Sequence, residues 1–317
     1  MRGWWQDLTD LVLPAECGGC GRPRTTLCEE CRASLYGAAP RRVRPIPMPP
    51  GLPVVHAAAP YEDAVRAVLL AHKERGVLGL AGPLGVALAG AVRASVAEAG
   101  GGVGGEGPAG TFTVGSASSL LLVPVPSAPS AVRARGHDPA RRIALAAAGE
   151  LRRCGVRARV LAVLRQRRVV ADQSGLDARQ RLANLSGALE VSAGGARLLA
   201  SASASASASA SASAAPGARS CHRSGAEPGA QVVIVDDLMT TGASLAEAAR
   251  AVGAVGMFSV RAERRVGRGA GTTRRTREEG AEEALSAGGD SGDRGSVNVV
   301  GAAVVAASPE SFEINRN

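Results

Sequence analysis

Two adjacent aspartates are the strongest candidates for chemistry in this chain. Asp236 and Asp237 follow residues 232–235, VVIV, a run of four β-branched residues. Such a run is typical of a central strand in a parallel sheet, and the carboxyl ends of these strands face the ligand crevice of an α/β protein. Two carboxylates at that place can accept hydrogen bonds from a diol, such as the hydroxyls of a sugar.

Small and hydroxyl-bearing residues follow the two acids, and residues 245–252 then have the pattern of a helix. Backbone amides at a helix start bind phosphate with help from the helix dipole, and Thr and Ser hydroxyls add donors. A phosphate site beside a diol site indicates a ribose 5-phosphate. The plainer interpretation is a strand, a turn and an N-capped helix with incidental acids. The loop residues expected to contact the phosphate are Thr240, Thr241, Gly242, Ala243 and Ser244.

Four cysteines near the start of the chain form a second candidate site. Cys17, Cys20, Cys28 and Cys31 make two CxxC pairs separated by seven residues. Two such pairs can supply four thiolates in a tetrahedron around Zn²⁺, and a site with four protein ligands is closed and structural. Cys154 and Cys221 are isolated and receive no role.

The composition predicts an α/β fold with an aliphatic core. Hydrophobic residues make up 45% of the 317 residues, but aromatic residues only 2%. The formal net charge is +9, and 36 of the 37 basic residues are arginines, as codon bias in a GC-rich genome would produce. This charge by itself is weak evidence for nucleic-acid binding. Walker and dinucleotide-binding glycine motifs are absent, which argues against ATP hydrolysis and hydride transfer.

The elements that must position these residues alternate between strands and helices. We expect helices over residues 61–73, 78–96 and 139–154, with Asp138 as an N-cap before Pro139. We expect strands over residues 120–125, 160–164, 232–235 and 299–307, which predicts a mostly parallel sheet covered by helices on both faces.

Three segments are expected to form the chain. Residues 1–38 form a zinc-ribbon-like module with four cysteine ligands, residues 39–53 a proline-rich linker, and residues 54–317 the α/β domain. Within that domain we expect disordered insertions at 192–228, which includes the Ser-Ala repeat, and at 264–298, because neither can bury enough apolar surface.

No uninterrupted apolar run of about 18 residues occurs, and Asp7 and Asp10 interrupt the region where a signal peptide would need one. We therefore expect a cytoplasmic protein without membrane insertion. In that reducing compartment, clustered cysteines are expected to be metal ligands rather than disulfides. The sequence leaves the oligomeric state open.

Several stretches resemble known proteins. Residues 232–245, VVIVDDLMTTGASL, are similar to the signature of phosphoribosyltransferases that use phosphoribosyl pyrophosphate. YEDAVRAVLLAHKERG at 61–76, LVPVPSAPSAVRARGHDPA at 122–140 and ADQSGLDARQRLANLSGAL at 171–189 resemble the ComF family, named for natural competence. The resemblance implies a type I phosphoribosyltransferase fold with an N-terminal zinc ribbon.

The resemblance also implies roles for residues outside the signature. Lys73 is either a phosphate contact or a solvated lysine at a helix end. Ser127 follows the strand at 120–125 where the family places a loop near the pyrophosphate, and Arg133 and Arg135 could neutralise that group. Pro129 departs from the basic or polar residue expected there. The hood segment carries polar side chains that could contact the acceptor or only secure the loop: Gln173, Ser174, Arg179, Arg181 and Asn184.

As an enzyme, the chain is expected to bind phosphoribosyl pyrophosphate with Mg²⁺ and to transfer ribosyl 5-phosphate to a nitrogen acceptor that the sequence does not identify. The alternative is a non-catalytic module that senses the same ligand or binds single-stranded DNA beside a competence helicase. Between Arg133 and Arg181 the chain has thirteen arginines and four acidic residues. That charge suits an anionic substrate and a nucleic-acid surface equally.

Overall fold

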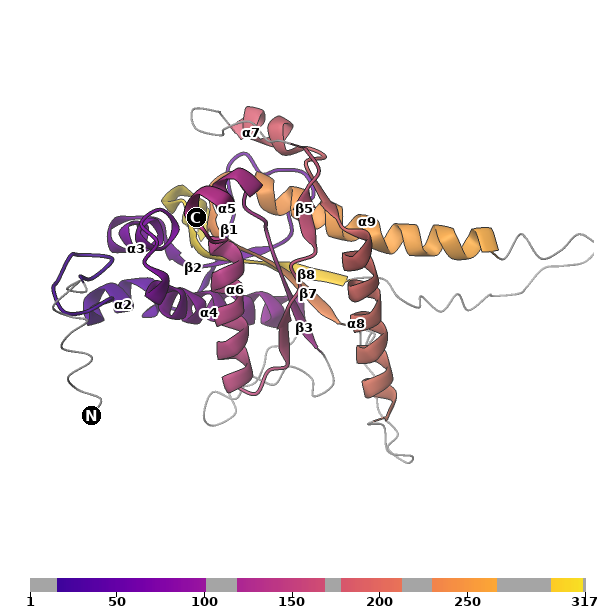
Figure 1. The fold of residues 1–317 in the computed structure, drawn as a ribbon, viewed down its shortest axis with the longest axis horizontal. Helices are drawn as coiled ribbons and strands as arrows, with labels where there is room; N and C mark the ends of the chain where they lie inside the picture. The colour runs from indigo at the N-terminus through magenta and orange to yellow at the C-terminus, as the bar shows by residue number, and fades with distance from the viewer. Residues whose placement is uncertain (1–15, 101–118, 169–177, 213–229, 267–297, 316–317) are drawn as a thin grey trace, which may run out of the picture.

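The computed structural model describes residues 16–100, 119–168, 178–212, 230–266 and 298–315. Its centre is a six-stranded sheet in the order β1-β2-β8-β7-β3-β4, in which β1 is antiparallel to its neighbour and the other five strands are parallel (Figure 1). The strands of this sheet are β1 (Arg41–Val43), β2 (Val55–Pro60), β3 (Leu120–Pro124), β4 (Ala158–Val160), β7 (Gln231–Met239) and β8 (Asn298–Ala307).

The strand order changes direction between β3 and β7. Strand β4 pairs with one edge of β3, and β7 pairs with the other edge. The next strand, β8, then lies beyond β7, on the side away from β3. In the register, Leu122 lies beside Val233 and Pro124 beside Val235. The crevice at such a reversal, outside the carboxyl ends of the strands, is where open α/β sheets bind ligands.

Helices cover both faces of this sheet, as expected. On one face α3 (Asp63–Lys73), α4 (Ala81–Ala99) and α6 (Pro139–Arg153) pack against Leu120 and Leu122, and on the other α9 (Ala243–Val266) packs against the alternate residues Leu121 and Val123. The strand side chains alternate between two cores because successive residues of a strand point to opposite faces. The largest fully buried side chains are Leu, Ile and Met, so the aliphatic core is confirmed.

Three boundaries differ from the sequence expectation. The strand predicted at 160–164 is two short strands, β4 and β5 (Leu164–Gln166), because the backbone leaves the main sheet after β4; β5 then pairs with β6 (Leu189–Val191) in a separate two-stranded sheet. The proline-rich segment contains β1, an edge strand of the main sheet, although it lacks periodicity. Helix α9 begins at Ala243 rather than at Leu245 and extends to Val266.

The Ser-Ala repeat also differs from the expected disorder. Helix α8 (Ala193–Ala212) continues through the repeat as far as Ala212, and the rest of the expected insertion, 213–229, lies outside the described residues. Alanine has the highest helix propensity and serine a moderate one, whereas the alternation of the two imitates only the period of a strand. Most of the second expected insertion, 267–297, likewise lies outside the described residues.

One helical segment, Leu78–Ala99, is long and apolar enough to cross a membrane by length and composition alone. It consists of a short 3-10 helix, Leu78–Leu80, and α4, and it packs against α6, β2 and β8. Just over half of its apolar window is buried inside the protein. The segment is a core helix of the α/β fold.

Candidate functional site

The two aspartates lie within the last part of β7, not after its end as the sequence suggested. The strand continues to Met239, where it pairs with Ala307 of β8. Asp237 is buried, with 6% of its surface exposed, and Asp236 is partly exposed. The backbone N–H of Asp237 donates to Oδ1 of Asp236 over 2.8 Å. The two carboxyl groups therefore lie together at the crevice end of a central strand.

Lys73 joins this pair from another part of the chain. It is the last residue of α3, and its Nζ donates to Oδ2 of Asp237 over 2.8 Å. The side chain of Lys73 is 33% exposed and that of Asp237 is 8% exposed. Lys73 is thus part of the site and not a fully solvated lysine at a helix end, which was one of the two open interpretations.

The surroundings shift the two acids in opposite directions. Burial raises the pKa of Asp236 well above its usual value, and the neighbouring charge of Asp237 adds to this shift. Burial also acts to raise the pKa of Asp237, but the Lys73 ammonium and its hydrogen bond outweigh it and leave that pKa below its usual value. Asp237 therefore carries the negative charge of the pair, and Asp236 is protonated more readily.

The loop after β7 turns sharply into α9. Gly242 has φ +73°, and a Cβ built on it would lie 3.1 Å from the Leu52 side chain and 3.2 Å from Pro45. Glycine fits both the conformation and the space. Because α9 begins at Ala243, its first amides have no partner within the helix and are available to an anion. Thr240 at the loop start is exposed, and Thr241 and Ser244 are partly exposed.

The loop after β3 runs beside this one because β3 and β7 are paired. Ser127 donates from its backbone N–H and its Oγ to the Asp138 carboxylate, over 3.3 and 3.4 Å. Asp138 also accepts from the backbone N–H of Arg141, which confirms it as the N-cap of α6. Pro129 occupies the first turn of the short helix α5 (Pro129–Arg135), where proline is favoured.

The two arginines expected beside the pyrophosphate differ in their contacts. Arg133 is exposed on α5. Arg135 forms a bidentate ion pair with Glu74, with its Nε and Nη2 at 2.9 and 2.8 Å from the two carboxylate oxygens. To bind an anion, Arg135 would have to use a donor that is not bound to Glu74, or break its ion pair with Glu74.

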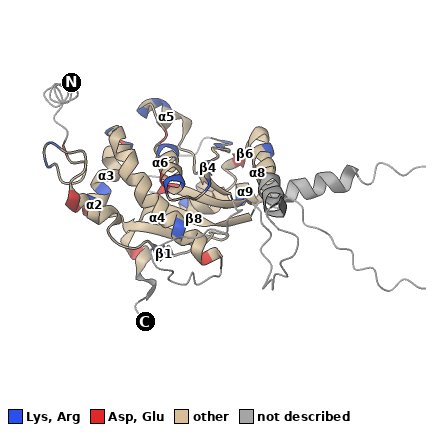
Figure 2. Ribbon diagram, turned by 90° about the horizontal axis from the view of Figure 1, so that it is seen from below, with Lys and Arg blue, Asp and Glu red and all other residues tan. Residues whose placement is uncertain are grey.

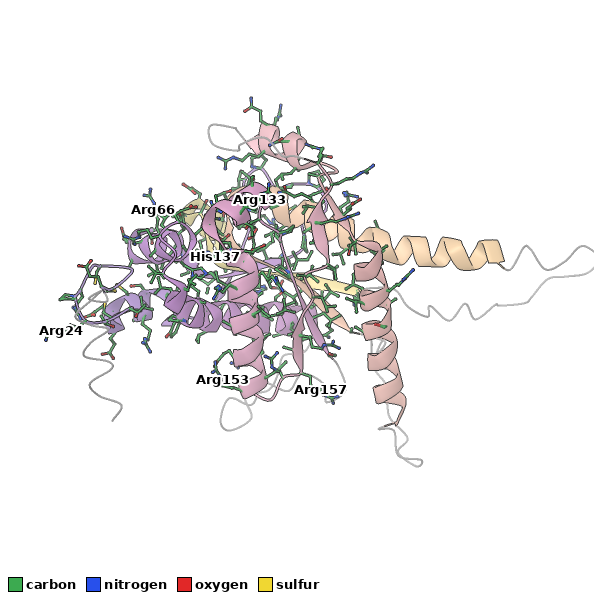
Figure 3. The ribbon with its side chains drawn as sticks, in the orientation of Figure 1. Arg24, Arg66, Arg133, His137, Arg153 and Arg157 are labelled. Atoms are coloured by element: carbon green, nitrogen blue, oxygen red, sulfur yellow. The ribbon has the colours of Figure 1, made fainter. Side chains whose placement is uncertain are left out.

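The excess of arginines between residues 133 and 181 is divided between two ends of the fold. Arg133 and His137 lie at one end of α6, and Arg153 and Arg157 at the other (Figure 3). Arg157 immediately precedes β4, so it lies at the amino end of a strand parallel to β3, opposite the crevice. Figure 2 shows basic positions on α5 as well as on helices elsewhere in the molecule. Only part of this charge therefore lies near the site.

The end of α3 carries contacts that the sequence did not indicate. His72 is fully buried, and its ring lies edge-on to that of His137, with 5.5 Å between the centroids. His72, Lys73 and Glu74 are consecutive, and they contact His137, Asp237 and Arg135, respectively. The lysine at this helix end could have drawn attention to the turn. However, the partner of Lys73 is 164 positions away along the chain and that of Glu74 is 61 positions away, so only the fold reveals them.

The hood segment, residues 171–189, contacts the loop after β7 through its described part. Gln173 and Ser174 lie outside the described residues. The described part is α7 (Ala178–Leu185), which carries Arg181, and Nη1 of Arg181 donates to Oγ1 of Thr240 over 3.5 Å. In Figure 1, α7 lies above the body of the molecule, on the side of α5 and of the start of α9. The hood therefore reaches the loop expected to bind phosphate.

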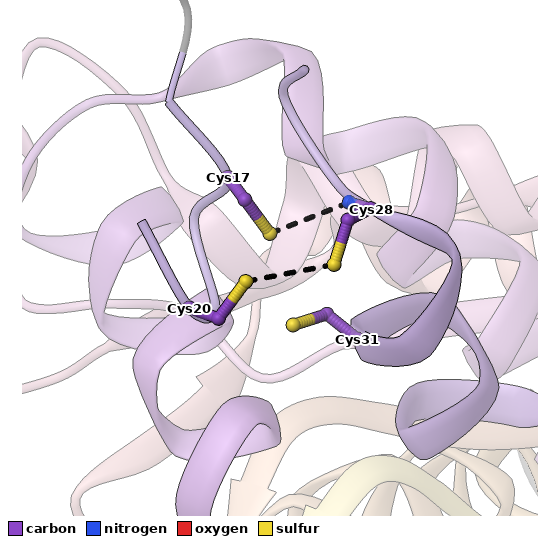
Figure 4. Close-up of side chains that lie close together, drawn as sticks. All are labelled: Cys17, Cys20, Cys28 and Cys31. Carbon is purple, nitrogen blue, oxygen red and sulfur yellow. Dashed lines mark hydrogen bonds between the residues drawn. The ribbon is translucent and has the colours of Figure 1, made fainter. Parts of the chain in front are cut away.

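The four N-terminal cysteines converge as predicted (Figure 4). Their sulfur atoms all lie within 4.8 Å of one another, and Sγ of Cys20 is 3.6 Å from Sγ of Cys28. A tetrahedral Zn²⁺ with Zn–S bonds of about 2.3 Å needs sulfur atoms about 3.8 Å apart. Burial acts to raise the pKa of Cys17, but backbone N–H donors from Cys20, Cys28 and Gly19 outweigh it and lower that pKa to about 6. The geometry and the donors fit a zinc-thiolate site.

This four-cysteine cluster packs directly on the α/β domain. Cys17, Cys28 and Cys31 share one hydrophobic cluster with residues of α3 and α4. Arg75 Nη2, just after α3, donates to the Gly18 carbonyl over 3.3 Å, and a Cβ built on Gly18 would lie 2.7 Å from Leu80. A methyl group at this position would require the Leu80 side chain to shift.

Comparison with known proteins adds one finding. A search among curated proteins found no similar sequence. Residues 182–276 match the phosphoribosyl transferase domain family, and this segment contains the paired aspartates and the loop that follows them. The chain therefore combines a phosphoribosyl transferase domain on a mixed, mostly parallel sheet with an N-terminal four-cysteine cluster that is compatible with a zinc ribbon.

Proposed function

We propose that this protein binds phosphoribosyl pyrophosphate with Mg²⁺ and transfers ribosyl 5-phosphate to a nitrogen acceptor, releasing pyrophosphate. The observation that carries the proposal is the position of Asp236 and Asp237 between the Lys73 ammonium and the loop that starts α9. A diol site, a phosphate site and a cation then lie at the switch point of the sheet, where this fold binds ligands.

Each part of the site would have a defined task. The loop of Thr240, Thr241, Gly242, Ala243 and Ser244 would hold the 5-phosphate, and the two carboxylates would accept from the ribose hydroxyls. Positive charge develops on the ribose carbon as the bond to pyrophosphate breaks, and the negative charge of Asp237 would stabilise it. Asp236, which is partly exposed and not bound to Lys73, is placed to accept the proton of the acceptor nitrogen.

The pyrophosphate would leave on the β3 side of the crevice. Ser127 supplies a hydroxyl there, and Arg133 and Lys73 supply positive charge. Mg²⁺ binds hard oxygen ligands and commonly takes several of them from phosphates, so the carboxylates and the ligand's own oxygens suit it. When bound, the ion would neutralise charge on the diphosphate.

Titration calorimetry with phosphoribosyl pyrophosphate, with and without Mg²⁺, tests this function. Saturable binding that strengthens in Mg²⁺ would support it. Absence of binding by the folded full-length protein under both conditions would contradict it. Release of pyrophosphate in the presence of candidate nitrogen nucleophiles would then separate an enzyme from a protein that only senses the ligand.

The rival function is a competence-linked platform for single-stranded DNA that acts with a helicase, as the resemblance to the ComF family implies. Exposed arginines on α5 and α6, including Arg133, Arg141 and Arg142, favour a polyanion. A filter-binding assay with single-stranded DNA over a salt series distinguishes the two, because contacts to several phosphates give a steep salt dependence. We also infer a cytoplasmic location, since the one described helical segment that is long and apolar enough to cross a membrane, Leu78–Ala99, packs against α6, β2 and β8.

A further inference from the structure

We propose that Arg181 of α7, in the described part of the hood segment, binds the 5-phosphate held by the loop after β7, so that α7 and the loop contact that group from two sides. This proposal rests on the proposed function, because it assigns a further ligand for the same phosphate. The polar residues of the hood were expected either to contact the acceptor or only to secure the loop, whereas the contact of Arg181 with Thr240 leads to the phosphate end of the ribose.

The first observation is an incomplete set of hydrogen bonds. Nη1 of Arg181 reaches Oγ1 of Thr240 over a long distance of 3.5 Å, while Nε is buried and has no acceptor among the described residues. A buried donor without a partner costs free energy, and such a group is usually satisfied by a ligand, an ion or water. The Nε of Arg181 therefore lacks an acceptor beside the loop that is expected to hold an anion.

The second observation is the chemistry of the guanidinium. Its Nε and Nη2 form a fork of parallel N–H donors that matches two oxygens of a phosphate. Nη1 is already directed to Thr240, the first hydroxyl of the loop. Since the Thr240 oxygen accepts from Arg181, the Thr240 hydroxyl can still donate its own hydrogen to an anion in the loop. A phosphate oxygen would satisfy the buried Nε.

The third observation is that the hood is anchored to the helix that starts at the phosphate loop. The buried Glu247 of α9 accepts from the backbone N–H of Leu189 over 3.0 Å. Arg250 of α9 donates to the Leu189 carbonyl over 2.9 Å and pairs with Glu247 over 2.7 Å. Burial acts to raise the pKa of Glu247, but its bonds to Arg250 and to backbone N–H groups keep that pKa below its usual value. The ion pair of Glu247 and Arg250 thus holds Leu189, at the end of the hood segment, against α9.

The same, C-terminal end of α7 has a second set of contacts. Arg168, which follows β5, donates to the carbonyls of Asn184 and Ser186 over 2.6 and 3.2 Å. Leu185 is buried at the last turn of α7. The C-terminal end of the helix that carries Arg181 is therefore held by Arg168, which follows β5, and by the contacts of Leu189, which begins β6. A guanidinium held in this way loses less conformational freedom when it binds an anion.

The test compares two probes that occupy different halves of the site. Ribose 5-phosphate reports on the phosphate loop, and inorganic pyrophosphate with Mg²⁺ reports on the β3 side. We expect Arg181→Gln to weaken ribose 5-phosphate binding by about tenfold or more, because a hydrogen-bonded charged group is lost. Pyrophosphate binding should be unchanged. Arg181→Lys, which keeps the charge but loses the fork, should lie between wild type and Arg181→Gln.

The matched control is Arg197→Gln, which makes the same change at an exposed position of α8. It should bind both probes as the wild type does. Wild-type affinity of Arg181→Gln for ribose 5-phosphate would overturn the assignment, as would an equal loss for both probes, which indicates a collapsed hood. If wild-type protein binds neither probe, the proposed function fails first. Circular dichroism of each variant identifies a folding defect, and Arg181→Lys, the smaller change, then decides the outcome.

Discussion

Lys73 and Asp237 are 164 positions apart in the sequence, and their side chains form an ion pair of 2.8 Å at the carboxyl end of the sheet. This pair connects the end of α3 to the strand that carries both acids. It also gives the two acids different pKa values, because among the described residues a cation contacts Asp237 and none contacts Asp236. Ribose hydroxyls would therefore meet one firmly charged carboxylate and one that is protonated more readily.

The strength of this pair can be measured in a double-mutant cycle of Lys73→Met and Asp237→Asn. Removing the ammonium alone leaves a buried carboxylate without its cation, so Lys73→Met should destabilise the protein more than the double variant does. Breaking a buried pair costs about 3 to 5 kcal/mol, and the partial exposure of Lys73 should reduce the coupling to about 1 to 3 kcal/mol. Urea unfolding of all four proteins gives this energy, and a coupling near zero would contradict the pairing.

Replacing Asp236 and Asp237 together by Asn should weaken binding of phosphoribosyl pyrophosphate in Mg²⁺. Asn keeps the shape but removes the charge, and hydrogen bonds to charged groups contribute about 1.5 to 3 kcal/mol each. Losing one of them lowers the affinity about tenfold or more. Thr241→Ala with Ser244→Ala should have a smaller effect, because the backbone amides of the loop remain. Calorimetric affinity close to wild type in the folded double Asn variant would refute this site assignment.

One Zn²⁺ should be bound per chain by the four cysteines. Cys17→Ser or Cys28→Ser should lower the zinc content measured by elemental analysis, whereas Cys154→Ser, at an exposed isolated cysteine, should not. A zinc content near zero in the wild type, or unchanged in both variants, contradicts the site.

Removal of zinc should also destabilise the α/β domain. The cysteines share a hydrophobic cluster with α3 and α4, so we propose that the four-cysteine cluster folds with that domain rather than as a separate module. A chelator should lower the temperature of a single cooperative transition. Two independent transitions, only one of them sensitive to the chelator, would indicate a separate module instead.

The buried His72 should make stability depend on pH below neutrality. Burial holds its pKa below the usual value, despite a hydrogen-bonding distance of 3.4 Å to the Val77 carbonyl. Its charged surroundings are His137 and Arg142, which act to lower this pKa, and Asp237, which acts to raise it. Below pH about 6.5 the unfolded chain binds a proton that the folded protein does not, so stability falls as the pH decreases toward the folded pKa.

Because one proton is involved, His72 can change the free energy of unfolding by at most about 1.4 kcal/mol per pH unit. Above pH about 6.5 its contribution to that free energy is constant. His72→Phe should flatten the decline between pH 7 and pH 5 in urea unfolding. Arg66→Gln, on the exposed face of the same helix, should leave the slope as in the wild type. An unchanged slope in His72→Phe would show that other groups cause the decline.

The local parts of the fold could be predicted because their signals lie within a few residues. The β-branched run before Asp236, the N-cap at Asp138 and the CxxC spacing each describe one strand, one helix start or one ligand pair, and the structure contains all three. The disorder expected for the Ser-Ala repeat was wrong as far as Ala212, because the expectation considered how little apolar surface the repeat can bury and not the helix propensity of alanine.

The sequence by itself identified the residue types of both candidate sites, because the paired acids, the small hydroxyl-bearing loop and the four thiols are contiguous or closely spaced. Only the tertiary structure decided that Lys73 contacts Asp237, that Glu74 holds Arg135 and that Arg181 reaches Thr240. These pairs join residues 59 to 164 positions apart. The physical reason is that strand order and helix packing bring distant segments together, and no local propensity or spacing encodes which of the arginines ends beside which acid or hydroxyl.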